Sequence, residues 1–171
     1  MNDYSHGSLG NVRDAQQLRI SEVFSSLQGE GPSSGAPSVF VRLALCNLRC
    51  SWCDTKYTWD FEQYRYEDEV TEVPVAQLAA ELAAAPEQRV VLTGGEPLLQ
   101  QAGLTRLLEL IPASIAVEVE TNGTLVPEEA LLARVDQWNV SPKLAHTGDP
   151  LAQRLRPAAL TALATSARAY L

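Results

Sequence analysis

Three cysteines lie close together and have the clearest capacity for chemistry in this chain. They are Cys46, Cys50 and Cys53, with three residues between the first pair and two between the second. Thiolates are soft ligands that suit iron–sulfur clusters and zinc. A four-iron cluster usually takes four cysteines, and the 171-residue chain has no fourth. One iron would stay open to an outside ligand, which favours a reactive cluster over a pure electron carrier.

Zinc is the main alternative occupant of this loop, because three cysteines and one histidine are a common tetrahedral zinc set. The two histidines of the chain are His6 and His146. His6 lies in a polar N-terminal stretch, whereas His146 follows the segment Ser141-Pro142-Lys143 and stays open as a fourth ligand. A disulfide framework is not expected, since the cysteines are odd in number and clustered.

A glycine-rich segment, Thr93-Gly94-Gly95-Glu96-Pro97, forms a second motif. It directly follows an expected strand, and its glycines allow close approach of backbone groups. Taken alone, the segment is more typical of a strand-to-helix turn with Pro97 at the first helical position, and the three-cysteine loop before it shifts the interpretation towards a cofactor contact. Two further polar turns, Thr121-Asn122-Gly123 and Ser141-Pro142-Lys143, also come directly after expected strands.

The hydrophobic pattern predicts alternating strands and helices, hence an α/β fold with a largely parallel sheet. Strands are expected at residues 19–24, 38–45, 89–92, 114–120 and 137–140, and helices at 75–85, 98–111, 127–134 and 157–168. Residues 1–17 are expected to be a loose segment, 28–37 a loop and 60–71 an irregular surface connection. The length suits a single domain over residues 1–171. Because the polar turns follow strands, they should meet at one rim of the sheet.

The end of the chain conflicts with this alternation. Ala169-Tyr170-Leu171 follows an expected helix, so Tyr170 and Leu171 would be the first residues of another strand. A parallel sheet that lacks an edge strand is costly. The expectation is therefore a partial, open (β/α) barrel, or a chain truncated at its C-terminus.

Composition narrows the partners and the compartment. The net charge is −8 and the pI about 4.7, which argues against nucleic-acid binding through a basic surface. No apolar run is long enough to cross a bilayer, and the N-terminus lacks an apolar signal core. A cytoplasmic protein with no membrane partner is expected.

At its motifs the chain resembles the radical S-adenosylmethionine enzymes, whose cluster signature is similar to Cys46-x3-Cys50-x2-Cys53. The Gly94-Gly95-Glu96-Pro97 turn resembles the one that contacts the methionine amino group of their cofactor. Three further segments are similar to the 7-carboxy-7-deazaguanine synthases of queuosine biosynthesis, and the resemblance runs from about Ile20 to Leu144. These segments are Phe24-Ser25-Ser26-Leu27-Gln28-Gly29-Glu30-Gly31, Cys50-Ser51-Trp52-Cys53-Asp54-Thr55 and Ser141-Pro142-Lys143.

This resemblance implies a radical carbon–nitrogen lyase with a fold of the radical S-adenosylmethionine type. Such a lyase converts 6-carboxy-5,6,7,8-tetrahydropterin to 7-carboxy-7-deazaguanine with loss of ammonia. The implied cofactors are a [4Fe–4S] cluster, S-adenosylmethionine and Mg²⁺. A flavodoxin-like reductant and a homodimer are implied as well. Family members continue beyond the point where this chain ends, so the cluster half is expected to be more complete than the substrate pocket.

The resemblance also implies residue roles, beginning with the three cysteines as cluster ligands. The cofactor would contact Trp52, Cys53, Asp54, Gly95, Ser141, Pro142 and Lys143. The substrate would contact Leu27, Gln28, Gly29, Arg42 and Thr93, with Glu30, Glu120 and Asn122 as weaker candidates. Arg42 would hold the substrate carboxylate, since a guanidinium matches that geometry, but it is also typical of a surface ion pair. Thr55 would offer an oxygen to Mg²⁺, and Asp54 is equally typical of a loop cap.

Two other functions remain open from the sequence. A glycyl-radical enzyme activase shares the cysteine loop and the Gly-Gly-Glu-Pro turn, but leaves Gln28-Gly29-Glu30-Gly31 and Arg42 unexplained. A non-catalytic fragment that binds a cluster or zinc is the third possibility, supported by the early end of the chain.

Overall fold

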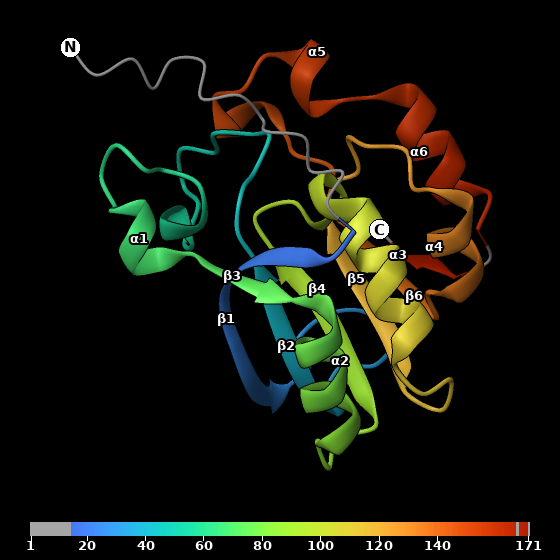
Figure 1. The fold of residues 1–171 in the computed structure, drawn as a ribbon. Coiled ribbons are helices and arrows are strands. Elements are labelled where there is room, and N and C mark those ends of the chain that lie inside the picture. Colours follow the sequence, from blue (N-terminus) through green and yellow to red (C-terminus); the bar gives the residue numbers. More distant parts are fainter. Residues whose placement is uncertain (1–14, 167, 171) are drawn as a thin grey trace.

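The computed structural model describes residues 15–166 and 168–170, and within them seven strands form one open sheet (Figure 1). The strand order is β3-β1-β2-β4-β5-β6-β7. The bounds are β1 (Gln17–Leu27), β2 (Pro37–Leu43), β3 (Thr71–Pro74), β4 (Arg89–Gly94), β5 (Ala116–Thr121), β6 (Gln137–Val140) and β7 (Ala169–Tyr170). The expected α/β fold with an unclosed sheet is confirmed. The loose segment expected at residues 1–17 falls mostly outside the described residues, and Gln17 already belongs to β1.

The sheet is parallel from β2 through β4, β5 and β6 to β7, as the alternation predicts. Two pairs differ, because β1 runs antiparallel to both β2 and β3. Residues 28–36 join β1 to β2 and are too few for the crossover that a parallel pair requires. At the other edge, Tyr170 lies in β7 and pairs with Asn139 of β6, which agrees with the strand expected at this point.

Helices cover one face of the sheet, with α2 (Val75–Ala84) and α3 (Gln101–Leu110) packed across its middle (Figure 1). The remaining helices are α1 (Tyr66–Glu69), α4 (Glu129–Arg134), α5 (Leu151–Arg154) and α6 (Pro157–Ala164), with 3₁₀ turns η1 (Lys56–Thr58), η2 (Pro97–Gln100) and η3 (Ala145–Thr147). Helix leucines such as Leu78 and Leu107 pack on strand residues such as Val41, Leu92 and Val119. This apolar contact forms the core.

Most predicted strands and helices differ from the structure by one to a few residues at their ends, and three differences have more consequence for the fold. The helix expected over residues 98–111 begins as the 3₁₀ turn η2, because the Glu96 carboxylate accepts a hydrogen bond from the Leu98 amide and caps that turn. The helix expected from Pro127 begins at Glu129. The connection expected at residues 60–71 includes the short helix α1. Strand β3 was not predicted at all, since four residues beside a proline carry little periodic signal.

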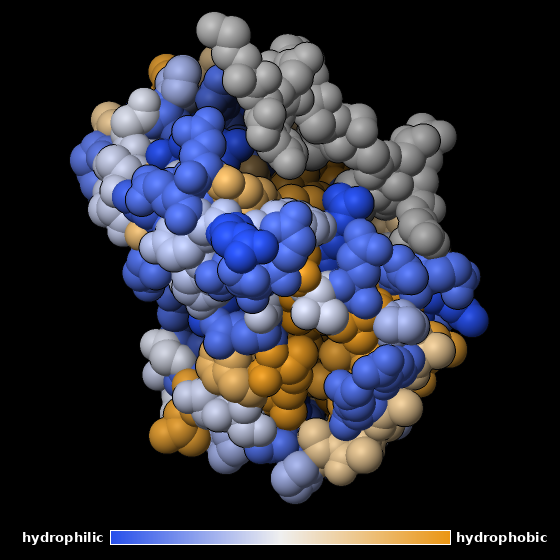
Figure 2. Space-filling model, turned by 60° about the vertical axis from the view of Figure 1, so that its left-hand side comes forward, coloured by the Kyte–Doolittle hydropathy of each residue, from blue (hydrophilic) through white to orange (hydrophobic). Residues whose placement is uncertain are grey.

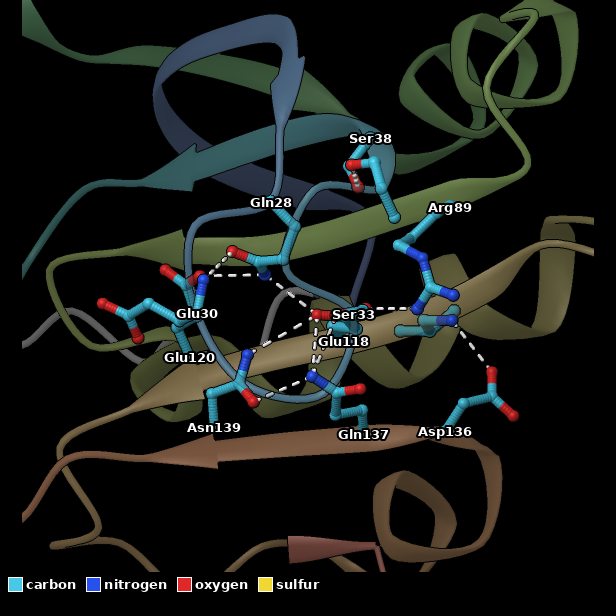
Figure 3. A network of polar contacts seen from close by, with 12 residues as sticks. Gln28, Glu30, Ser33, Ser38, Arg89, Glu118, Glu120, Asp136, Gln137 and Asn139 are labelled. Carbon is cyan, nitrogen blue, oxygen red and sulfur yellow. Dashed lines mark hydrogen bonds and ion pairs between the residues drawn. The ribbon is translucent and has the colours of Figure 1, made fainter. Parts of the chain in front are cut away.

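The opposite face of the sheet carries polar side chains near the carboxyl ends of its strands. Alternate strand residues point to opposite faces, so Val117 and Val119 enter the core while Glu118 and Glu120 face away from the helices. Strand register aligns Arg42 with Thr93. These strands therefore present a polar row on the face that the loop 28–36 covers (Figure 3).

Hydrophilic side chains dominate the upper left of the face in Figure 2. Hydrophobic residues are exposed in the lower middle of the same face. Among the helices of the described residues, none combines the length and the apolar character that crossing a membrane would demand.

Candidate active site

The three cysteines line one pocket at the carboxyl ends of the strands. Cys50 is buried, and Cys46 and Cys53 are partly exposed. The wall also includes Leu48, Trp52, Asp54, Thr55, Trp59, Gly94, Gly95, Asn122 and Lys143. The cysteine loop, the Gly-Gly turn, the Asn-Gly turn and the Ser-Pro-Lys turn all contribute, so the predicted convergence of four segments is confirmed.

The Gly-Gly turn is pressed against the backbone that leads into the cysteine loop. The amide of Gly95 donates to the Leu43 carbonyl (2.9 Å), and that of Glu96 donates to the Leu45 carbonyl (2.8 Å). A Cβ on Gly94 would overlap the Leu43 carbonyl, and a Cβ on Gly95 would overlap that of Leu45. Gly94 also has φ +123°, in a region that disfavours other residues. Both glycines are required by this contact.

Glu96 joins this turn to the end of β5. Its buried carboxylate accepts hydrogen bonds from the Leu98 amide (3.0 Å), the Thr121 hydroxyl (2.8 Å) and the Asn122 amide (2.8 Å). Burial raises the pKa of Glu96, although these three donors favour its charged form. Asn122 in turn donates to the Asn47 side chain (3.0 Å), inside the cysteine loop. The glutamate of the motif therefore acts in this structure as a brace between strands.

The segment after β6 holds the cysteine loop from another side. The Ser51 amide donates to the Thr147 carbonyl (2.9 Å), and the Arg49 amide donates to Oδ1 of Asp149 (3.0 Å). The Ser51 hydroxyl donates to the His146 carbonyl (3.2 Å). Asp149 and Thr147 were not predicted from the sequence, because no motif marks residues whose role is to accept hydrogen bonds from the amides of a distant loop.

Trp52 lines the pocket, and His146 packs against it. Trp52 is 52% exposed, and the His146 ring stacks on its indole ring with centroids 5.6 Å apart. Nζ of Lys143 lies 5.5 Å from the same ring and donates to the Ser141 hydroxyl (2.9 Å). His146, which had no predicted role beyond a zinc ligand, packs against an aromatic wall.

Hydrogen bonds reach the cysteine sulfurs from within the loop. The indole Nε1 of Trp59 donates to Sγ of Cys53 (3.3 Å), and the Leu48 amide donates to Sγ of Cys46 (3.5 Å). The Arg49 guanidinium stacks 4.9 Å from the Trp59 ring centroid and donates to the Trp59 carbonyl (2.8 Å). Trp59 was missed from the sequence. Its signal was an aromatic residue six positions after the last cysteine.

The three thiols that line the pocket are the usual ligand type of an iron–sulfur cluster. Burial raises the pKa of the Cys46 thiol to about 12. Within residues 15–166 and 168–170, no three His, Cys, Asp or Glu side chains converge tightly enough to hold one metal ion. A cubane places each thiolate on a different iron, so its ligands need only surround a common space. The donor set therefore fits a [4Fe–4S] cluster. His6 lies outside the described residues.

The predicted substrate residues lie beside this pocket, on the polar face. Nε of Arg42 pairs with Glu22 (2.5 Å), as its ion-pair alternative predicts. The Thr93 hydroxyl donates to Oε2 of Glu120 (2.6 Å). Gln28 is buried rather than open to a ligand, and its amide is committed to nearby carboxylates and backbone groups. Leu27 is 63% exposed, and a Cβ on Gly29 would meet no neighbour.

A comparison with protein families matches residues 41–155 to the Radical SAM superfamily. The match covers most of the chain and contains all three cysteines. The chain belongs to the radical SAM superfamily.

Individual relatives of this radical SAM chain carry a consistent name. A "7-carboxy-7-deazaguanine synthase" of Pyrobaculum aerophilum is 46% identical over 134 residues, which are 77% of this chain and 58% of the relative. Another of Rhodospirillum rubrum is 50% identical over 119 residues, 66% of this chain and 45% of the relative. A crystal structure of QueE from Escherichia coli superposes with a TM-score of 0.68 at 30% identity, covering 92% of this chain and 72% of that one. The resemblance stated from the sequence is confirmed, and the chain spans about half the length of the curated relatives it matches.

Replacing Trp59 by phenylalanine tests the sulfur contacts of the radical SAM pocket. The reconstituted cluster is expected to have a more negative reduction potential, because a hydrogen bond to a ligand sulfur stabilises the extra electron of the reduced state. Redox titration followed by electron paramagnetic resonance measures it. Tyr57→Phe is the matched control, since Tyr57 lies near Trp59 in the chain but its hydroxyl donates to Glu22 of β1 rather than to a cysteine. Equal potentials in Trp59→Phe and the native protein would contradict the assignment.

Proposed function

We propose that this chain is the radical SAM core of a 7-carboxy-7-deazaguanine synthase, acting on 6-carboxy-5,6,7,8-tetrahydropterin. The observation that carries the proposal is the placement of Arg42, Thr93 and Glu120 beside the cysteine pocket, on adjoining strands. An arginine and a carboxylate on one face suit a ligand that has a carboxylate at one end and N–H donors at the other. The names of the relatives support the same substrate class.

The cysteine pocket would hold the cluster and the cofactor. When bound, the cluster supplies the electron that cleaves S-adenosylmethionine into methionine and a 5′-deoxyadenosyl radical. Cys46, Cys50 and Cys53 would ligate the cluster. Trp52 and Lys143 line the exposed mouth, where a broad aromatic surface and a cation suit a nucleoside with an anionic tail. Asp54, Gly95, Ser141 and Pro142 complete the proposed cofactor contacts, and Thr55 would offer a hydroxyl to Mg²⁺.

Arg42 and Glu120 would orient the substrate on the polar face. The ion pair with Glu22 engages Nε of Arg42, and the outer nitrogens of its guanidinium are the part that grips a carboxylate in parallel bonds. Thr93 and Gln28 both donate to the Glu120 carboxylate, which holds it in one orientation. Leu27, Gly29 and Glu30 would border the substrate from the adjacent loop.

Substrate binding should weaken as the pH falls through the pKa of Glu120. Burial raises that pKa above the ordinary 4.5, an effect that the hydrogen bonds from Thr93 and Gln28 partly offset. A protonated carboxyl accepts fewer hydrogen bonds from the pterin N–H groups, so the acid limb should lie above pH 4.5. Dissociation constants measured from pH 5 to 8 should show this limb in the native protein and lose it in Glu120→Gln. If the loss of affinity at low pH has the same midpoint in the native protein and in Glu120→Gln, the titrating group is not Glu120.

Anaerobic reconstitution with iron and sulfide, followed by reductant, S-adenosylmethionine and the carboxypterin, tests the proposal as a whole. The expected products are 5′-deoxyadenosine and 7-carboxy-7-deazaguanine. Stoichiometric zinc without iron would refute the radical chemistry. 5′-Deoxyadenosine without the deazaguanine would refute the substrate, and radical transfer to a glycyl-radical protein would instead identify an activase.

The assembly and setting of the chain remain part of this proposal. A single domain is proposed from the length of the chain, and a homodimer and a flavodoxin-like reductant from the family resemblance. A cytoplasmic location is proposed because clustered cysteines are typical of metal ligands in a reducing compartment. Sedimentation of the reconstituted protein and electron transfer from reduced flavodoxin test the dimer and the reductant.

A further inference from the structure

A buried carboxylate under the proposed substrate site has no role in the chemistry described so far. Glu118 lies in the middle of β5 with a fully buried side chain. It forms an ion pair with Arg89, whose side chain is 27% exposed. Its Oε2 accepts hydrogen bonds from Gln28 Nε2 (2.9 Å) and Gln137 Nε2 (3.2 Å), and Asn139 Nδ2 lies 3.5 Å away (Figure 3).

Such a carboxylate needs a reason, because burying a charge costs several kcal/mol per ion unless it is paired and hydrogen-bonded. Replacing a buried ion pair as a whole by hydrophobic residues is often neutral or stabilising, so stability alone does not explain why Glu118 and Arg89 are charged. The partners of Glu118 come from β4, β6 and the loop 28–36, so its bonds join elements that are distant in the sequence. Figure 3 shows Glu118 between Gln28 on one side and Gln137 and Asn139 on the other.

The loop 28–36 is held to the sheet mainly through Gln28. Its Nε2 bridges Glu118 and Glu120, the second at 3.2 Å. Its Oε1 accepts hydrogen bonds from the amides of Gly29 (2.7 Å) and Glu30 (3.0 Å) and so folds the loop back on itself. The Gln28 side chain therefore couples the shape of the loop to the orientation of Glu120.

A second contact holds the far side of the same loop. Gln137 Nε2 donates to the Ser33 hydroxyl (3.0 Å) as well as to Glu118. Gly31 has φ +65°, and a Cβ there would collide with the side chains of Asn139 and Gln137. The loop thus rests on the polar floor that Glu118 organises.

We propose that Glu118 is a positioning residue for the substrate site: through Gln28 it fixes both the loop 28–36 and the Glu120 carboxylate. The inference rests on the proposed function for its substrate. The Glu118 side chain itself, being fully buried, touches neither substrate nor cofactor. Its partner Arg89 keeps its charge balanced at the amino end of β4.

Glu118→Gln tests this role, since it keeps the shape and removes the charge that three amide donors share. We expect cluster content and the background cleavage of S-adenosylmethionine to match the native protein, because Glu118 is not part of the cysteine pocket. Hydrogen exchange at the Gly29 and Glu30 amides should become at least about tenfold faster, as expected when a buried network loses a member. KM for the carboxypterin should rise at least about tenfold, with a smaller change in kcat.

A double-mutant cycle separates positioning from a general loss of stability. Once Gln28→Ala has removed the bridge, adding Glu118→Gln should change KM and loop exchange by less than twofold. Glu72→Gln is the matched control, because it removes a carboxylate from an exposed ion pair with Arg19 and should change neither. If Glu118→Gln fails to fold, Gln137→Ala removes the Ser33 contact and should accelerate exchange in residues 29–36.

Two results would overturn the proposal: loop exchange and KM unchanged in the variant that folds, or effects that add fully to those of Gln28→Ala. Failure of the native protein to act on the pterin would refute the proposed function. The exchange measurements would then still decide whether Glu118 holds the loop and Glu120.

Discussion

Replacing Gly95 by alanine should dismantle the cysteine pocket. The new methyl group would overlap the Leu45 carbonyl, and the neighbouring carbons of Leu45 and Cys46 would also lie too close. The strand ends cannot separate without breaking the Gly95–Leu43 and Glu96–Leu45 hydrogen bonds. We expect a loss of about 3 kcal/mol or more in unfolding free energy, at the upper end of overpacking effects, and a cluster content well below that of the native protein.

Chemical denaturation and iron and sulfide analysis after reconstitution measure these two effects. Gly29→Ala is the matched control, because a Cβ at Gly29 meets no atom within 4 Å. It should retain the native cluster content and lose less than about 1 kcal/mol. A Gly95→Ala protein with a full cluster would show that the turn yields easily, and that the contact with Leu45 is not what shapes the pocket.

Replacing Arg42 by methionine should abolish productive binding of the carboxypterin while sparing the cluster. The guanidinium is the group that would pair with the substrate carboxylate, and leaving a buried charge without its partner costs about 2–5 kcal/mol. That corresponds to a loss of about 30-fold or more in kcat/KM. Glu22 keeps its hydrogen bond from Tyr57 in the variant, so the fold should tolerate the change.

Steady-state kinetics and the ratio of 5′-deoxyadenosine to deazaguanine measure the Arg42→Met result. Cleavage of S-adenosylmethionine should continue without ring contraction, because the cysteine pocket does not include Arg42. Arg19→Met is the control: Arg19 forms an exposed ion pair with Glu72 on the neighbouring strands β1 and β3. An Arg42→Met enzyme with native kcat/KM would mean that the Glu22 ion pair is the whole function of this arginine.

The pocket and the polar face share their supports, which gives these predictions a common basis. Thr93 ends the row of proposed substrate residues, and the next residue, Gly94, already lines the cysteine pocket. Glu120 is followed by Thr121 and Asn122, both of which bond to Glu96 below the same pocket. A radical formed beside the cysteines would therefore arise next to residues that adjoin, in the chain, the groups proposed to hold the substrate.

The sequence by itself determined the chemistry of the cysteine loop and most of the elements around it. Thiol spacing, the absence of a fourth cysteine and the turns after strands are local properties, and local patterns survive folding unchanged. Strand β6 (Gln137–Val140) was predicted to the residue, and α2 to within one residue. Arg42, the one charged residue in the largely apolar strand β2, was a signal of the same local kind.

Only the tertiary structure decided which polar residues act together. A glutamine at position 28 looks the same in the sequence whether its side chain binds a substrate or a buried carboxylate. Its burial depends on Glu118, which lies 90 positions further along the chain. Trp59 and Asp149 likewise gain their partners from loop packing, for which no periodic pattern exists. Strand β1 runs antiparallel to β2 because the connection between them, residues 28–36, is too short for a parallel crossover. The alternation of strands and helices alone did not indicate this direction. The type and spacing of residues along the chain indicate which chemistry they can perform. The tertiary contacts decide which partner each side chain binds.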